Sequence, residues 1–543
     1  MPLTAIERVL AAEAAGAWRC VQTHLSCVVL GGERVYKLKK PVSLGFVDFA
    51  PAEARRDACL EEVRLNRRLA PEIYLGVAPL VETDAGVAFG PVRERAEAAE
   101  GEGKGERVLD WATAMWRLPA DGLLDGVLAR LEAAGDRGER LGPALDRFAD
   151  RLARFHAACP GGAEIARWGH PVAVLRRLKN SLAGLHGHGL GILGATVPEG
   201  EPTPWLELAR LVGRRVQAAM PVLAERHARG LVREVHGDLH ARNLCLLDGE
   251  IVAFDCIEFS FELRCRDIAA DATRVGFDLA ARGFDPLGRR FLAAWAEAAG
   301  DPGAHEVFPV FAARDGVVHA FVESVTVGEP EVSGQDRSVA AAASRNYALV
   351  AVGYALPRPA LVILCGLPGT GKSVVAAAAA RPLRATVLRS DAIRKELAGL
   401  PATARGDPSI YTPDWNARTY AELERRAGRA LAAGEHVILD ANHGRRADRA
   451  RMRALADRLG AIPLLVEMTC PEGEIRRRLA ARSEDRGEVS DAGIAAFERQ
   501  RAAFEPPDAA AEAPLVLTPS DDGPARIAWR LAALANSRPP SPA

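Results

Sequence analysis

The sequence predicts a multidomain protein of mixed α+β and α/β class. Short strand-like runs with one helix fill residues 1–118, and helical patterns dominate from about residue 145 to 355, interrupted by a loop-rich stretch. After residue 360, apolar runs of strand length alternate with helical patterns, as in a parallel sheet. With 543 residues the chain is long enough for several domains with sizeable cores.

In the first region, residues 34–39 alternate with a period of two, which predicts a strand with Lys37 and Lys39 on one face. Residues 55–69 carry a helical pattern, and residues 107–118 predict another strand. A small mixed α+β lobe over residues 1–118 and a larger helical lobe over residues 119–355 follow from these patterns.

Two prolines in four residues make 356–360 the predicted linker, because proline breaks helices. An α/β domain is expected over residues 361–535. Its first strand is the apolar run 361–365, and a helix should begin near Lys372. Residues 536–543, rich in proline and serine, predict a disordered tail. Further strands are predicted at 385–388, 436–439 and 463–468.

Composition excludes several classes of protein. The formal net charge of -1 argues against a dedicated nucleic-acid binder, which normally carries a basic excess. Nine scattered cysteines without a CxxC pair indicate neither a disulfide framework nor a zinc site, so we expect a cytoplasmic protein. No run approaches the roughly 18 apolar residues of a membrane helix, and no sequence feature points to a protein partner.

The first motif, His-Gly-Asp-Leu-His-Ala-Arg-Asn, covers residues 236–243, and Asp255 follows twelve residues later. Phosphoryl transfer needs a carboxylate that accepts a hydroxyl proton, oxygen ligands for Mg²⁺ and a cation on the nucleotide phosphates. A loop and a short hairpin could bring Asn243 and Asp255 to one metal ion. The stretch therefore predicts ATP chemistry, with Asp238 available as a base.

This stretch resembles the aminoglycoside phosphotransferase family, relatives of the protein kinases, whose loop carries the same HGDxxxxN and a downstream aspartate. The resemblance implies a bilobal protein-kinase-like fold for the region up to residue 355. It also implies that Asp238 is the catalytic base, that Asn243 and Asp255 bind Mg²⁺, that His236 organises the loop, and that Asp267 is structural.

In the small lobe the same resemblance matches Lys37 to the strand lysine that grips the α and β phosphates of ATP, and Glu62 to the helix glutamate that positions it. Lys39 and Lys40 are alternative candidates for the lysine. Adjacent Glu61 competes with Glu62, and a surface ion pair would explain either glutamate.

The second motif is a GxxxxGKS loop that follows an apolar strand and leads into a helix. Its spacing lets backbone N–H groups turn inward on phosphates, and the helix N-terminus adds its positive dipole. Lys372 is expected to reach the β and γ phosphates, and Ser373 to hold Mg²⁺. The predicted phosphate-binding residues are Gly366, Pro368, Gly369, Thr370, Gly371, Lys372 and Ser373.

Downstream, a Ser-Asp-x-x-Arg pattern places Asp391 after a strand, at the sheet edge where ligands bind in open α/β sheets. The pattern resembles the small P-loop kinases of the polynucleotide kinase, zeta toxin and gluconate kinase group. By that resemblance Asp391 would activate the acceptor hydroxyl and Arg394 would bind the acceptor; a helix N-cap with an exposed arginine is the alternative. Asp440 closes another strand and looks like a Walker B carboxylate that holds a metal-bound water.

Arg478 and Arg482 share one helix face at i, i+4 spacing within the arginine-rich segment 474–484. This segment resembles the arginine lid that closes over the transferring phosphate in the same kinases. A solvated basic face paired with Glu474 and Glu484 is the competing interpretation.

The sequence therefore predicts a tandem ATP-dependent, Mg²⁺-dependent phosphotransferase that phosphorylates a hydroxyl group of a small molecule such as a sugar, amino-sugar or nucleoside-type acceptor. In one alternative the P-loop unit is a regulatory ATPase switch that controls the first unit. In another it is a polynucleotide 5′-hydroxyl kinase, which the near-neutral charge disfavours.

Overall fold

The protein is described by a computed structural model that covers residues 4–14, 16, 18–23, 25–44, 47–84, 86–94, 107–193, 203–329, 332–401, 404, 408–482 and 493–537. Contacts divide the chain into two compact units. Unit 1 consists of residues 1–174 and 221–308, and unit 2 of residues 175–220 and 309–543. The helices at 175–220 and 309–355, which the sequence pattern groups with the helical lobe, therefore belong to the same compact unit as the parallel sheet.

Unit 1 begins with a six-stranded antiparallel sheet in the order β1-β2-β3-β8-β6-β7. Helix α2 packs on β3, β6 and β8, and a core of apolar residues fills the space between them. Lys37 lies on β3, an inner strand of the sheet, and is the register partner of Thr113 on β8. The elements are α1 Ala5–Ala14, β1 Arg19–Gln22, β2 Ser26–Gly31, β3 Arg34–Lys39, β4 Ser43–Leu44, β5 Val47–Asp48, α2 Ala52–Asn66, β6 Tyr74–Thr83, β7 Gly86–Phe89 and β8 Arg107–Trp116.

The rest of unit 1 is mainly helical, with two small antiparallel pairs, β9 with β12 and β10 with β11. Helices α4, α10 and α11 pack together, and α10 is buried along its whole length. The elements are α3 Leu124–Ala133, α4 Gly142–Ala158, α5 Ala163–Gly169, β9 Val232–Glu234, β10 Leu244–Leu247, β11 Glu250–Ala253, α9 Phe261–Arg264, β12 Cys265–Asp267, α10 Ile268–Ala281 and α11 Asp285–Ala298. Three helices cross a unit boundary: α6 Pro171–Leu193, α8 Met220–Ala228 and α12 Ala304–Gly328.

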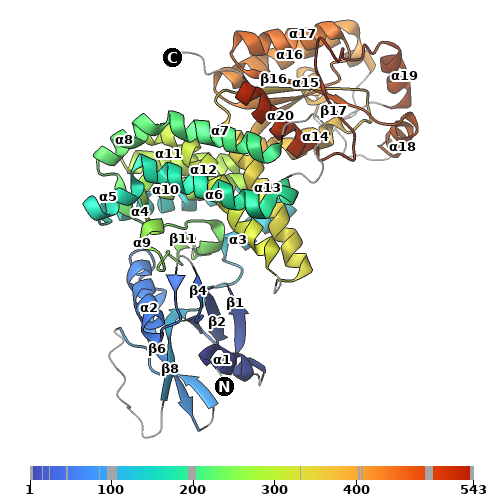
Figure 1. Cartoon of the computed structure of the whole chain (residues 1–543). Coiled ribbons are helices and arrows are strands. Elements are labelled where there is room, and N and C mark those ends of the chain that lie inside the picture. Colours follow the sequence, from blue (N-terminus) through green and yellow to red (C-terminus); the bar gives the residue numbers. More distant parts are fainter. Residues whose placement is uncertain are drawn as a thin grey trace. The chain divides into compact units, whose positions relative to one another are not determined.

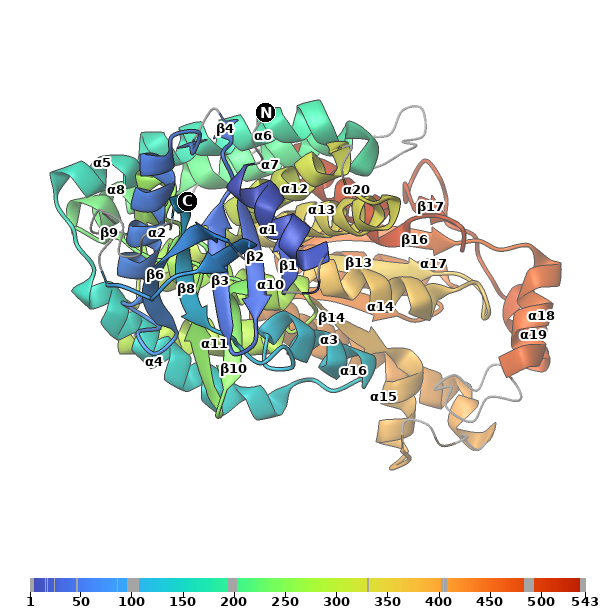
Figure 2. The same ribbon diagram turned by 90° about the horizontal axis from the view of Figure 1, so that it is seen from below.

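Unit 2 contains a five-stranded sheet, parallel throughout, in the order β14-β15-β13-β16-β17. Helices α14 and α20 cover one face, and α16 and α17 cover the other (Figures 1 and 2). Every residue of β13 is buried, as expected for a central parallel strand. The elements are β13 Ala360–Cys365, α14 Lys372–Leu383, β14 Ala385–Arg389, α15 Ser390–Leu397, α16 Pro413–Ala432, β15 His436–Asp440, α17 Arg446–Arg458, β16 Ile462–Met468, α18 Glu472–Arg482, α19 Ile494–Ala502, β17 Leu515–Leu517 and α20 Gly523–Ser537.

Two helices from earlier in the chain extend one helical layer of unit 2. Helix α7, Pro204–Ala218, packs on α20, and α13, Gly334–Ala355, packs on α14 and α20. The approach of α13 to α14 is close, since a Cβ at Gly353 would lie 2.8 Å from the carbonyl oxygen of Pro382. These helices therefore form part of the core around the parallel sheet.

The predicted strands and helices are present, with shifts of a few residues at their ends. The short segment between α13 and β13 lies where the linker was predicted, although Leu356 within it is buried. Helix α20 continues to Ser537, two residues into the predicted tail; the remainder of that tail lies outside the described residues. Within the described ranges, no helix is both long and apolar enough to cross a membrane.

Candidate active sites

Lys37, Glu62 and Asp255 meet in unit 1. The pairing of Lys37 with Glu62 was expected from the sequence, whereas the contact of Lys37 with Asp255 was not. Lys37 Nζ lies 2.9 Å from Glu62 Oε1 and also contacts Asp255 Oδ1. Glu62 is fully buried, while the Asp255 side chain keeps 42% of its surface exposed. The backbone N–H of Asp255 donates to Tyr74 Oη at 3.0 Å. A strand, a helix and a loop far apart in the sequence thus place three charged groups around one point.

Lys39, an alternative candidate for the site lysine, also contacts Glu62. Its Nζ lies 2.6 Å from Glu62 Oε2 and contacts Glu258 Oε1 as well. Lys37 differs because it alone of the two contacts Asp255. Glu61, the rival of Glu62, turns away and pairs with Arg64 at 2.7 Å and with Arg264 at 2.8 Å.

The electrostatics of this group favour the charged forms of Glu62, Lys37 and Lys39. Burial opposes the ionised form of Glu62, but the two ammonium groups outweigh burial and hold its pKa at about 2. Burial likewise disfavours charged Lys37, yet Asp255, Glu62 and Glu258 raise its pKa well above the ordinary value. The pKa of Lys39 is raised for the same reason, by Glu258 and Glu62 against burial.

Asp238 and Asn243 lie in contact at the start of the neighbouring loop. Asn243 Nδ2 donates to Asp238 Oδ2 at 3.3 Å and to its backbone oxygen at 3.0 Å. His240 Nε2 is 3.2 Å from Asp238 Oδ2, and the side chain of Asp238 is one-third exposed. The backbone N–H of Phe254 donates to the Asn243 carbonyl at 3.0 Å, which brings the Asp255 segment alongside.

Asp271 on α10 holds the His-Gly-Asp turn in place. Its carboxylate accepts the backbone N–H groups of His236 at 3.3 Å and Gly237 at 2.9 Å. His156 Nε2 lies 3.1 Å from the same carboxylate, while His156 Nδ1 accepts the Trp295 Nε1–H. These contacts show how buried helices fix the conformation of the loop.

The other loop residues also have structural contacts. The pKa of His236 lies below its ordinary value because of burial, and its Nε2 is 3.0 Å from the Phe254 carbonyl oxygen. Asp267 caps α10 by accepting the Ala269 N–H at 2.8 Å, and it pairs with buried Arg226 at 2.8 Å. The role of Asp267 in this structure is therefore capping and ion pairing.

The predicted Mg²⁺ ligands of unit 1, Asn243 and Asp255, fit the preference of this ion for oxygen donors. Mg²⁺ characteristically uses one or two protein carboxylates and takes its other ligands from phosphates and water. Among the described residues there is no group of three or more His, Cys, Asp or Glu that could hold a metal ion.

The GxxxxGKS loop of unit 2 wraps around the N-terminus of α14, and three of its glycines have positive φ: Gly366 at 140°, Gly369 at 83° and Gly371 at 98°. A Cβ at Gly366 would lie 2.5 Å from the Met468 carbonyl oxygen, so only glycine fits there. Lys372 Nζ donates to the carbonyl oxygens of Gly366 and Leu367, both at 2.8 Å.

The rest of the loop adopts the expected strand-to-helix arrangement. Thr370 Oγ1 donates to the Leu367 carbonyl at 2.8 Å, and Pro368 and Ser373 line the adjoining cavity. The backbone N–H of Gly366 donates to the Asn442 carbonyl at 3.1 Å, tying the loop to the segment after β15. These contacts fix the loop between β13 and the N-terminus of α14, the kind of position at which backbone N–H groups can bind an anion.

Asp440 lies where β14 and β15 end together, since Arg389 and Asp440 are register partners. Arg389 Nε is 3.2 Å from Asp440 Oδ2, and Ser390 Oγ donates to the Asp440 carbonyl at 3.4 Å. With Ser373, Asp440 gives oxygen donors suited to Mg²⁺. Buried His443 follows; burial lowers its pKa to about 4, so its imidazole is neutral near pH 7.

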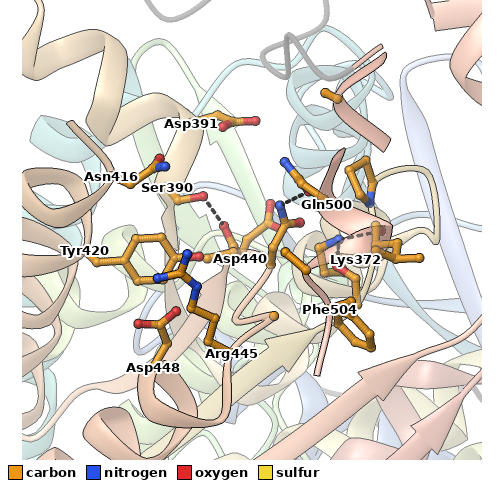
Figure 3. Close-up of a pocket in the computed structure, with 18 of the residues that line it drawn as sticks. Lys372, Ser390, Asp391, Asn416, Tyr420, Asp440, Arg445, Asp448, Gln500 and Phe504 are labelled. Atoms are coloured by element: carbon orange, nitrogen blue, oxygen red, sulfur yellow. Dashed lines mark hydrogen bonds between the residues drawn. The ribbon is translucent and has the colours of Figure 1, made fainter. Parts of the chain in front are cut away.

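A cavity of about 810 Å³ opens at this sheet edge, and Lys372, Asp391 and Asp440 lie in its wall (Figure 3). Arg394 also lines this cavity. Asp391 faces the cavity from the first turn of α15. Arg394 is buried, donates to the Ile410 carbonyl at 2.9 Å, and lies over the ring of Tyr411 at 5.0 Å. The exposed arginine of the alternative interpretation is therefore wrong.

Arg478 of α18 lies beside the phosphate loop, because its Nη1 is 3.8 Å from the position that a Cβ on Gly371 would occupy. Its Nε is 2.6 Å from Glu474 Oε1. Hydrogen bonds from Arg477 and from Arg478 lower the pKa of Glu474 to about 2. Arg482 ends α18, and its side chain lies outside the described residues, as does Glu484.

Sequence reasoning missed one side of this cavity. Asn416, Tyr420, Arg445 and Asp448 line it from α16 and α17 and the segment between β15 and α17, on the opposite side of Asp440 from Lys372 (Figure 3). Burial raises the pKa of Asp448, although nearby arginines act in the other direction. No motif marks these residues, because only the packing of helices on the sheet brings them together.

Comparison with known families identifies one domain. The family AAA_33, described as an AAA domain, matches residues 361–507. Among solved structures, a putative kinase from Chloroflexus aurantiacus J-10-fl is 25% identical, with a TM-score of 0.27, over 32% of this chain and 96% of that chain. A choline/ethanolamine kinase family protein from Mesorhizobium loti is 12% identical, with a TM-score of 0.32, over 63% of this chain and 98% of its own.

A relative matches most of the chain. The uncharacterized protein Rv2004c of Mycobacterium tuberculosis (strain ATCC 25618 / H37Rv) is 32% identical over 458 residues, which span 83% of this chain and 82% of the relative. The similarity is too long to be explained by the P-loop domain alone. The chain therefore belongs to the same family as this mycobacterial protein and contains a P-loop domain of the AAA_33 type over residues 361–507.

Proposed function

We propose that the protein is a tandem ATP-dependent kinase in which each unit transfers a phosphoryl group to a hydroxyl of a small molecule. One observation carries the proposal: the phosphate loop, Asp391 and Asp440 line a single cavity of about 810 Å³ that continues well beyond the loop. A pure nucleotide switch needs room for the nucleotide alone. The part of the cavity beyond the phosphate loop, and the polar residues that line it, favour an enzyme that also binds a phosphoryl acceptor.

In unit 2, the loop amides and Lys372 would bind the β and γ phosphates of ATP. To do so, Lys372 would exchange its hydrogen bonds to the Gly366 and Leu367 carbonyls for bonds to phosphate oxygens. Ser373 and Asp440 would hold Mg²⁺, which supplies charge neutralisation on the phosphates when bound. Asp391 would accept the proton of the acceptor hydroxyl, while Arg478 stabilises charge on the transferring group from the loop side.

The acceptor would bind between α15, α16 and the segment after β15. Asn416, Tyr420, Arg445 and Asp448 offer hydrogen-bond donors and acceptors there, and buried Arg394 supports the wall through Ile410 and Tyr411. Such a mixed polar surface suits a compact hydroxylated molecule better than a nucleic-acid strand, which would need a long basic track.

In unit 1, we propose an aminoglycoside-phosphotransferase-like site on a bilobal kinase-like fold. Lys37 would bind the α and β phosphates, and Glu62 would keep it in place. Asn243 and Asp255 would hold Mg²⁺. Asp238, one-third exposed and fixed by the loop that Asp271 anchors, would accept the proton of the acceptor hydroxyl.

We also propose that the protein acts in the cytoplasm on small molecules, without a membrane or nucleic-acid partner. All nine cysteines are free thiols, which suits a reducing compartment.

Transfer of labelled phosphate tests the proposal. The protein is incubated with γ-labelled ATP and a metabolite extract, and labelled compounds are identified for wild type, Asp238→Asn and Asp391→Asn. These conservative changes remove one carboxylate each, so each variant should lose one set of labelled products and keep the other. Wild-type protein that labels no compound, or variants that both retain all products, would contradict the proposal.

The regulatory alternative makes a different prediction in the same experiment. If unit 2 were only a switch, Asp391→Asn would leave its ATP hydrolysis unchanged and acceptor would not stimulate it. Measuring ATP turnover with and without extract, in an Asp238→Asn background, separates the two functions.

A further inference from the structure

Lys39 occupies an unusual place for a lysine, since its side chain has no exposed surface. Its ammonium group contacts two carboxylates from different parts of unit 1, Glu62 of α2 at 2.6 Å and Glu258 of the loop after β11. Glu258 is itself 95% buried. Burying an unpaired ammonium group is strongly unfavourable, so this position needs both partners.

The contact between Lys39 and Glu258 matters because Glu258 lies close to Asp255 in the sequence. Glu258 follows Asp255, the proposed metal ligand, by three residues. Asp255 itself has a left-handed backbone conformation, with φ of 62°, which is uncommon for a residue other than glycine. Three backbone hydrogen bonds hold the segment at its start and middle. Asp255 N–H donates to Tyr74 Oη at 3.0 Å, Cys256 N–H to Asn66 Oδ1 at 2.8 Å, and Ile257 N–H to the His236 carbonyl at 3.2 Å. At its far end, Arg264 Nη1 donates to the Glu258 carbonyl at 3.1 Å, and Lys39 holds the Glu258 carboxylate.

The two lysines therefore have different tasks. Lys37 contacts Asp255, and it would have to leave that carboxylate when phosphates and Mg²⁺ bind. Lys39 pairs with Glu62 and Glu258 instead of Asp255. Binding of phosphates and Mg²⁺ at Asp255 would therefore leave both contacts of Lys39 in place. Glu62 would keep one counter-ion while its other lysine engages the nucleotide.

We propose that Lys39 is a positioning residue: a fixed, buried cation that joins α2 through Glu62 to the Asp255 segment through Glu258, and so sets Asp255 for the metal-bound nucleotide. This inference rests on the proposed nucleotide site of unit 1. It assigns a role to a second lysine and to Glu258, neither of which would touch the nucleotide.

The test measures how strongly Mg²⁺ improves binding of a nonhydrolysable ATP analogue. The full chain is used with Lys372→Ala throughout, which removes the main phosphate contact of unit 2. Dissociation constants are measured in excess Mg²⁺ and in EDTA, and the thermal melting of the ligand-free protein is recorded. The variants are Lys39→Met, Glu258→Gln and the double variant, which removes one positive and one negative charge together.

We expect Lys39→Met to lower the melting temperature, and the double variant to recover most of that loss because the buried charges balance again. In the double variant and in Glu258→Gln, the improvement in binding due to Mg²⁺ should fall at least tenfold, while binding in EDTA changes less than threefold. If Lys39 and Glu258 served only to stabilise the fold, the double variant would regain the Mg²⁺ effect together with its melting temperature.

Asp110→Asn is the matched control. Asp110 forms a buried ion pair with Arg55 at 2.8 Å in the same sheet-containing lobe, yet this pair contacts neither Glu62 nor Asp255. The Asp110→Asn variant should have a lower melting temperature but an unchanged Mg²⁺ effect on binding of the analogue.

The outcomes separate the two proposals. If an added Lys37→Ala weakens analogue binding by the Lys372→Ala protein, but the double variant and Glu258→Gln keep the full Mg²⁺ effect, the role of Lys39 is wrong and the site of unit 1 stands. If the Lys372→Ala protein binds no analogue, or binds it equally well with and without an added Lys37→Ala, the proposed site of unit 1 falls and this inference falls with it.

Discussion

At the scale of single residues, each candidate site contains a charged group that its contacts hold in place. Glu62 is fully buried between two ammonium groups, and Lys372 is held by carbonyl oxygens of its own loop. Each group can be tested by a substitution that removes its charge and changes little else.

Glu62→Gln tests the buried charge cluster. Because the pKa of Glu62 is about 2 in the folded protein, against an ordinary value of 4.5, its ionised form adds stability above about pH 4.5 that is lost as pH falls toward 2. The variant leaves two buried ammonium groups short of a counter-ion, so we expect a loss of about 3–5 kcal/mol at pH 7.

Urea unfolding of wild type and Glu62→Gln at pH 7 and pH 3 measures this loss. The difference in unfolding free energy should be smaller at pH 3. If the difference in unfolding free energy stays constant or grows at pH 3, the pKa of Glu62 is not lowered in the folded protein.

Lys372→Ala tests the phosphate loop. A hydrogen bond to a charged group contributes about 1.5–3 kcal/mol, so the affinity of unit 2 for an ATP analogue should fall roughly tenfold to a hundredfold. Calorimetric titration in a Lys37→Ala background isolates this site. Lys179→Ala, at an exposed position on α6, is the control and should bind the analogue as the background does. Equal affinity in Lys372→Ala would contradict the role given to this lysine.

At the scale of elements, the loop between β13 and α14 depends on backbone conformations that side chains rarely adopt. Gly369 has φ of 83°, and an added Cβ would lie 3.1 Å from Ile475 Cγ2 of α18. Gly434, in the turn between α16 and β15, has the same φ, but an added Cβ there would meet nothing within 4 Å. This pair separates backbone strain from loop function.

We predict that Gly369→Ala and Gly434→Ala each lose about 1–2 kcal/mol of stability, because both place a Cβ in the left-handed region. Only Gly369→Ala should also weaken binding of the ATP analogue, by disturbing the loop and its contact with α18. Thermal melting and titration of both variants check this. Loss of binding in Gly434→Ala, or normal binding in Gly369→Ala, would contradict the argument.

Most elements could be predicted because their cause is local. The apolar run at 361–365 becomes β13, and the period-two pattern at 34–39 becomes β3. The motif residues were also found, since glycine spacing and the HGD turn are visible in one short segment. Glu258 and Asp271 carry no such signal, although both fix candidate site loops through contacts from distant segments.

At the scale of the whole molecule, the chain passes between the two compact units three times, at residues 174, 220 and 308. Unit 2 consequently depends on segments on both sides of the predicted linker. Helix α13 buries Leu349, Val350 and Val352 just before that linker.

We predict that a fragment of residues 356–543 is poorly soluble and lacks a cooperative melting transition. Without α7 and α13, the faces of α14 and α20 that they cover would be exposed, and each large apolar side chain left in water costs about 1.5–3 kcal/mol. Expression yield and calorimetry of the fragment measure the effect.

Cleavage at a protease site inserted beside exposed Pro357 is the control, since it breaks the chain but keeps both helices present. The cleaved protein should stay folded. A stable, cooperatively melting 356–543 fragment would show that the added helices are dispensable.

The sequence by itself determined the order of helices and strands, the phosphate loop with its preceding strand, and the acid and amide residues around positions 238–255, because these depend on periodicity and short-range spacing. Only the tertiary structure decided which lysine reaches Asp255, that a second lysine is buried between Glu62 and Glu258, and that helices before residue 356 complete the core around the parallel sheet. The physical reason is that burial and charge pairing depend on segments that meet only after folding.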